Sequence, residues 1–123
     1  MAFSNRDRLR RKIRAIPVQV RKAARDQLKA NAQELVETMK GFAPVQEGPL
    51  VSSIKEQDVS DSTRISRRVS AGDRSAPYVS WVEFGHGQAA PRPFFWPAYR
   101  LKRRRFKARM TRTAKKAVQE AIK

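Results

Sequence analysis

Seven of the ten aromatic residues of this chain lie within Ala76 to Tyr99, and two strongly basic arms flank that segment. Residues 1–40 hold 11 basic and 4 acidic side chains, and residues 100–123 hold 11 and 1, so the arms carry net charges of +7 and +10. Residues 41–99 hold six of each sign and are neutral. A packed core is therefore expected in the middle of the chain, whereas the arms need each other or a partner to become ordered.

The length of 123 residues fits a single domain with a modest core. We divide it into a basic N-terminal arm, a folded core and a basic C-terminal helix, over residues 1–16, 17–99 and 100–123. A net charge of +17 directs such a chain toward polyanions or toward an acidic protein surface, and does not choose between the two.

A long helix is predicted for the N-terminal third. From Pro17 to Lys40, apolar and small side chains recur every three or four residues and form one stripe: Val20, Ala24, Leu28, Ala32, Leu35 and Met39. Pro17 suits the first helical turn, and Gly41 suits the position after the last one. The sequence upstream keeps a helical period, which is compatible with a short preceding helix or with a kink at Pro17.

The next segment predicts a loop followed by a β-hairpin. The prolines and glycine of residues 43–49 mark the loop, and residues 50–60 and 63–71 read as two strands joined around Asp61 and Ser62. The apolar residues of the first strand do not alternate regularly, so a bulge or a short first strand is expected.

Residues 76–85 have apolar side chains at helical spacing and end at Gly85, which predicts a short central helix, with a third strand as the alternative. A long final helix is predicted from about Phe94 to Ala121, with Pro97 in its first turn. The expected fold class is therefore α+β, in which long N-terminal and C-terminal helices pack on a small antiparallel sheet.

Candidate catalytic chemistry is confined to Glu83 and His86, whose spacing would allow an acid–base pair at one helix end. No nucleophile, second carboxylate or set of metal ligands accompanies them, and a lone histidine beside glycines is more often a loop or intersubunit contact. The absence of cysteine excludes disulfides, thiolate zinc sites and thiol catalysis. We therefore expect no catalytic residue, no metal, no cofactor and no enzymatic activity.

The aromatic block at Phe94, Phe95 and Trp96 could form a platform on which nucleic-acid bases stack. Prolines bracket the block at a helix start, so packing onto the core or onto a subunit is the preferred interpretation. Trp96 falls on a different helical face from Phe95 and Tyr99, and is the member expected to face a neighbouring subunit.

The basic residues of both arms are candidates for contact with DNA or with an acidic partner: Arg10, Arg11, Lys12, Arg14, Lys102, Arg103, Arg104, Arg105, Lys107 and Arg109. Those of the C-terminal helix occupy every side of it, which a merely solvated face would not require. The alternatives are pairing with acidic neighbours in an assembly and a soluble tail. No base-reading motif is present, so any DNA contact should ignore sequence.

An ordered set of short blocks resembles a known family. These blocks are Ala43-Pro44-Val45, Gly48-x-Leu50, Ser53-Ile54, YVSWVEFG from Tyr78 to Gly85, and Pro91-x-Pro93-Phe94-Phe95-x-Pro97-Ala98-Tyr99. Their order and spacing over residues 40–100 are similar to those of the neck or tail-completion proteins of long-tailed bacteriophages. His86, in place of a small hydroxyl residue, and the strongly basic arms depart from the family pattern.

The resemblance implies a structural protein of the virion that completes the tail end and helps to join it to the head. It implies a ring around the DNA channel, with a hexamer as the first expectation, in contact with tail-tube and head-closure proteins. The residues expected at an oligomer or partner interface are Trp81, Glu83, Phe84, His86, Phe94 and Trp96. A rival interpretation, a sequence-independent basic nucleic-acid-binding protein, explains the charge but leaves the aromatic blocks unexplained.

No membrane association is expected, because no run approaches the 18 or so apolar residues that a span needs. The arginine-rich N-terminus also lacks the apolar stretch of a signal peptide. Synthesis in the cytoplasm of a bacterial host, followed by incorporation at the head–tail junction of the virion, is the predicted localisation.

Overall fold

The structure is a computed structural model, and it describes residues 5–43, 48–74, 76–88 and 90–122, with side chains in the first helix from Val18 onward. Within these ranges, four helices and two strands follow each other: α1 (Asn5–Phe42), α2 (Gly48–Ser52), β1 (Lys55–Asp58), β2 (Arg67–Ser70), α3 (Val79–Phe84) and α4 (Phe95–Ala121).

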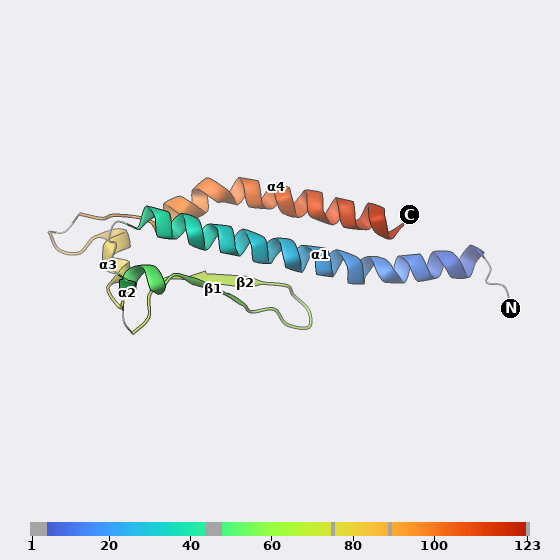
Figure 1. Cartoon of the computed structure of the whole chain (residues 1–123), viewed down its shortest axis with the longest axis horizontal. Helices are drawn as coiled ribbons and strands as arrows, with labels where there is room; N and C mark the ends of the chain where they lie inside the picture. Colours follow the sequence, from blue (N-terminus) through green and yellow to red (C-terminus); the bar gives the residue numbers. More distant parts are fainter. Residues whose placement is uncertain (1–4, 44–47, 75, 89, 123) are drawn as a thin grey trace.

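The two long helices lie side by side and antiparallel, and the hairpin of β1 and β2 packs on the other side of α1 (Figure 1). The short helices α2 and α3 lie at the end of the molecule where α1 ends and α4 begins (Figure 1). The strands are antiparallel, with Lys55 opposite Ser70 and Asp58 opposite Arg67. This arrangement confirms the predicted α+β class.

The apolar core is concentrated at that same end. It is built from the last turns of α1, from α2, from α3 and from the start of α4, through Leu35, Val36, Met39, Ala43, Leu50, Ile54, Ala76, Val79, Phe94 and Ala98. Farther along the helix pair, the buried apolar side chains among those described are alanines: Ala32, Ala117 and Ala121. Most of the apolar burial therefore holds the compact end, and the far end of the helix pair depends on other contacts.

The predicted start of the first helix is wrong. The helix begins at Asn5 and passes through Pro17, which was expected in its first turn. Proline removes one backbone donor and crowds one earlier carbonyl, at a cost of about 3 kcal/mol. The helix-favouring arginine, lysine and alanine residues on both sides continue the helical period across it, as the upstream sequence pattern indicated.

The start of the hairpin also differs from its prediction. Gly48 to Ser52, expected to close the loop and open the first strand, form α2, and β1 begins only at Lys55, which realises the short first strand. The hydroxyl of Ser53 explains the choice, because it donates to the Leu50 carbonyl at 2.7 Å and accepts from the Gly72 N–H at 3.1 Å. These bonds hold the helical turn against the end of the hairpin. Residues 44–47 of the predicted loop lie outside the described residues.

The two C-terminal helices agree with their predictions. α3 is helical, although it begins at Val79 and so three residues later than predicted, and the third-strand alternative does not apply. It is followed by Gly85, whose φ of 83° favours glycine. α4 begins at Phe95, one residue from the predicted start, and ends at Ala121 as predicted.

Polar contacts join α1 to α4 along the alanine-rich part of the pair. The Arg109 guanidinium donates to both oxygens of Glu34, at 2.7 and 3.4 Å. One turn farther along, Thr113 donates to Gln27, which donates to buried Asn31. The hydrogen bond from Arg109, with the charges of Lys102 and Arg105, holds the pKa of Glu34 below its ordinary value.

The first prediction concerns acid stability. A depressed folded-state pKa means that Glu34 stabilises the fold above its unfolded pKa, and that this contribution disappears as the pH falls through the lower folded pKa. Glu34→Gln should therefore lower the free energy of unfolding by about 1 kcal/mol near pH 7, and much less near pH 3. Urea unfolding at the two pH values measures this, with exposed Glu37→Gln as the control. An equal loss at both pH values would contradict it.

Candidate functional site

Large apolar side chains are exposed together on α3 and on the first turns of α4. The exposed fractions are 54% for Trp81, 68% for Phe84, 46% for Trp96 and 41% for Tyr99. Scattered exposed apolar residues are ordinary, whereas an aromatic group on two adjoining elements is typical of an interaction surface. Trp81, Phe84 and Trp96 were predicted at an interface, and the single chain leaves all three accessible.

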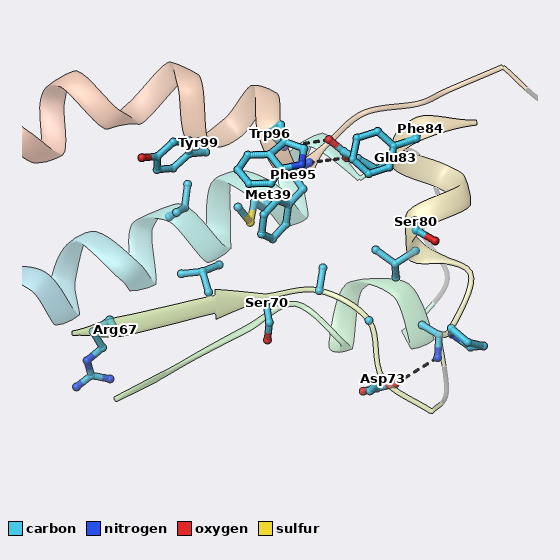
Figure 2. A pocket seen from close by; sticks show the side chains of 17 residues that line it. Met39, Arg67, Ser70, Asp73, Ser80, Glu83, Phe84, Phe95, Trp96 and Tyr99 are labelled. Carbon is cyan, nitrogen blue, oxygen red and sulfur yellow. Dashed lines mark hydrogen bonds between the residues drawn. The ribbon is translucent and has the colours of Figure 1, made fainter. Parts of the chain in front are cut away.

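Between these helices and the hairpin lies an open groove of about 880 Å³. β2 and the turn that follows it form one side, and Trp96 and Tyr99 of α4 lie on the opposite side (Figure 2). Leu35, Met39 and Phe95 contribute the apolar surface between them. Sequence reasoning missed this groove, because its lining comes from segments that are far apart in the chain and become neighbours only in the fold.

Glu83 connects the two helices that carry the aromatic residues. Its side chain is only 6% exposed, and its carboxylate accepts hydrogen bonds from three backbone N–H groups, those of Phe94 at 2.8 Å, Phe95 at 2.9 Å and Trp96 at 3.0 Å. These are donors at the start of α4, which has no cap from its own N-cap side chain. A carboxylate at this position also interacts favourably with the positive end of the helix dipole.

Two of the predicted interface residues are thus buried in the single chain. Glu83 caps α4, and Phe94 is fully buried in the core. Both hold the exposed aromatic residues in place, and a direct contact of either with a partner stays a prediction.

The structure does not assemble the acid–base pair that the spacing of Glu83 and His86 allowed. The Glu83 carboxylate is occupied by backbone donors of α4. His86 is exposed, and its ring stacks on Trp81 with the centroids 4.2 Å apart and the planes 15° apart. Among the side chains that the structure describes, no group of three potential metal ligands occurs.

The predicted basic contacts divide into three groups. Arg103, Arg104, Arg105 and Lys107 are exposed on α4 and have no acidic side chain within ion-pair distance in the described part of the chain. Lys102 and Arg109 are half-buried, and Arg109 is paired with Glu34 of the same chain, so contact of either with DNA or with an acidic partner stays a prediction. Arg10, Arg11, Lys12 and Arg14 lie on α1 where only the backbone is described.

Most of the chain matches a known protein family. Residues 7–85 match the HK97-gp10-like family, described as "Bacteriophage HK97-gp10, putative tail-component". The match spans more than half of the chain. The chain belongs to this family. The predicted resemblance to phage tail-assembly proteins is thereby confirmed at the level of a tail component.

The HK97-gp10-like match covers most of α1, the hairpin and α3, and it ends at Gly85, before the proline-bracketed aromatic block and α4. No curated protein and no solved structure matches the chain. In the described ranges, no helix is long and apolar enough to cross a membrane.

The second prediction tests the cap. Glu83→Ala leaves the first N–H groups of α4 without their acceptor, and should lower the free energy of unfolding by about 2 kcal/mol. Thermal unfolding measures the loss. The rate of amide hydrogen exchange should increase most at Phe95 and Trp96. His86→Ala, in the neighbouring loop, should change stability by no more than about 0.5 kcal/mol. Similar losses in the two variants would remove the capping role.

Proposed function

We propose that this HK97-gp10-like protein completes the end of a phage tail and helps to join it to the head, as a ring around the DNA channel. The proposal is carried by the exposed aromatic side chains of Trp81, Phe84 and Trp96, at one end of the molecule (Figure 1). The chain that carries them belongs to a tail-component family. A protein whose work is assembly needs such a surface, and a soluble monomer does not.

The proposed ring contact uses Trp81 and Phe84. Both are exposed on α3, and the Trp81–His86 stack adds a flat, rigid surface beside Trp81. Rigid aromatic side chains lose little conformational entropy when they are buried, and for this reason they often carry the binding energy of an interface. The sixfold symmetry that the resemblance implies makes a hexamer the first expectation, with tail-tube and head-closure proteins as neighbours in the virion.

A second candidate is sequence-independent binding of nucleic acid, and one observation favours it. Arg103, Arg104, Arg105 and Lys107 are exposed on α4 without acidic partners in the described part of the chain. In the ring, the same side chains would face phosphates in the channel or an acidic surface of a neighbouring protein. A nucleic-acid-binding protein would bind DNA as a single chain, whereas in the ring proposal DNA binding depends on assembly.

The third prediction separates assembly from folding. Trp81→Ala should abolish or weaken self-association, or association with a tail-tube protein, while its melting temperature stays near that of the native chain. Phe94→Ala removes a fully buried core aromatic and should lower stability by about 3 to 5 kcal/mol. Light scattering after size exclusion and negative-stain microscopy measure assembly. A native chain that stays monomeric and also ignores tail-tube protein would refute the ring.

The fourth prediction concerns the basic face of α4. Replacing Arg103, Arg104 and Arg105 with Gln should reduce the slope of log affinity for DNA against log salt by up to about three units, one for each lost phosphate contact, without a change in sequence preference. Anisotropy titrations with two unrelated duplexes measure it. An unchanged slope combined with failed head-to-tail joining in a complementation assay would assign these arginines to an acidic protein surface.

A further inference from the structure

Among the described residues, no strand lies beside the outer edge of β2. The described residues form a sheet of only two strands, so β2 pairs with β1 on one side and faces the groove on the other. An unpaired strand edge presents free N–H and C=O groups, and natural proteins cover, charge or use such edges.

The register shows which groups face outward. The Val59 N–H donates to the Ser66 carbonyl at 3.0 Å, which makes these two residues a hydrogen-bonded pair just beyond the strand ends. Such pairs alternate along an antiparallel ladder, so the backbones of Arg68 and Ser70 bond toward β1. The backbones of Arg67 and Val69 therefore point away from β1, and both residues line the groove.

The groove has room and chemistry for an added strand. A further strand would lie about 4.8 Å from β2 and run about 13 Å along its four residues. Its side chains would alternate, with one set directed toward the apolar surface of Met39 and Phe95 and the aromatic rings of Trp96 and Tyr99 (Figure 2). Backbone pairing with pockets for alternate side chains is the physical basis of recognition by strand addition.

Charge distinguishes the two ends of the groove. Toward α3 the groove is closed by Ser80 and Phe84, and toward the other end it runs past Tyr99 and Arg67 (Figure 2). The α4 face that carries Tyr99 continues after one turn and two turns with Arg103 and Lys107, because residues four apart share a helix face. Both are exposed and have no acidic side chain within ion-pair distance in the described ranges, whereas Arg67 is paired with Glu56 and Asp58. The positive charge at this end of the groove is therefore supplied by α4.

We propose that the groove binds an extended segment of a partner protein, in which alternating apolar residues are followed by acidic residues, as a third strand beside β2. The proposal rests on the proposed function, in which this chain joins other virion proteins. A second copy of the chain suits the groove less well, because the +7 and +10 charges of its arms would repel Arg103 and Lys107.

The experiment uses the full chain and a defined probe, an acetylated peptide of eight residues. Its first five residues alternate between valine and threonine, and its last three are glutamates. It should bind with a dissociation constant of about 100 µM or tighter. Binding should also slow the exchange of the Arg67 and Val69 amides by about tenfold or more, measured by NMR. The same peptide with alternate amides N-methylated keeps its side chains but cannot pair with β2, and should not bind.

Two charge-reversed variants provide the matched control. Arg103→Glu with Lys107→Glu alters the groove side of α4, and Arg112→Glu with Lys116→Glu makes the same change, at the same spacing, on the opposite side of the helix. The first pair should weaken peptide binding by about tenfold and the second by less than about threefold. Circular dichroism checks that both variants fold.

Several outcomes would overturn the proposal. These are no binding at millimolar peptide, equal binding of the methylated peptide, or equal effects of the two variants. Protection of the β2 amides that rises with protein concentration in the absence of peptide would assign the groove to a second copy. Displacement of the peptide by a short DNA duplex, with the duplex perturbing the β2 amides, would assign it to nucleic acid. Because peptide binding is measured on the unassembled chain, its failure leaves the ring untouched, and a failed ring leaves peptide binding measurable.

Discussion

The interaction on which the rest of this structure depends is the capping of α4 by the carboxylate of Glu83. It fixes the helix that carries the basic arm to a six-residue helix that could not be stable alone. It also decides which side chains are exposed. With Val79 and Glu83 directed inward, one turn apart, Trp81 and Phe84 are left on the outer side of α3. The exposed aromatic surface is thus a consequence of the cap.

Away from this end, the helix pair is held by specific polar contacts more than by burial. The alanines at the seam contribute little apolar area, whereas the Arg109–Glu34 pair and the Thr113–Gln27 bond match particular positions on the two helices. Buried Asn31 adds to this, because it bonds to Gln27 while its Nδ2 has no protein partner among the described residues. Such contacts favour one register over others and add only modestly to stability.

The sequence allowed prediction of features whose signals are local. The apolar stripes of both long helices and the stop at Gly85 are of this kind. The helix start predicted at Pro17 was wrong because proline's preference for the first helical turn is only a preference. It does not measure how strongly the neighbouring residues favour a helix. Short apolar runs such as that around Leu50 fit a strand and a helical turn equally well. The cap by Glu83 joins residues 11 to 13 positions apart, and the pair of Arg109 with Glu34 joins residues 75 positions apart. Only the fold shows these contacts.

The placement of charge on α4 has a consequence for assembly. The helix begins at a neutral, aromatic surface and becomes cationic from Arg100 onward, so any contact between copies at the aromatic end brings several such helices near one another. Their mutual repulsion opposes a ring, and it is relieved by anything anionic that binds them. DNA or an acidic partner would therefore strengthen the proposed assembly. By thermodynamic linkage, assembly would strengthen the binding of that anionic partner by the same factor. A ring built in this way would be most stable where its anionic partner is present.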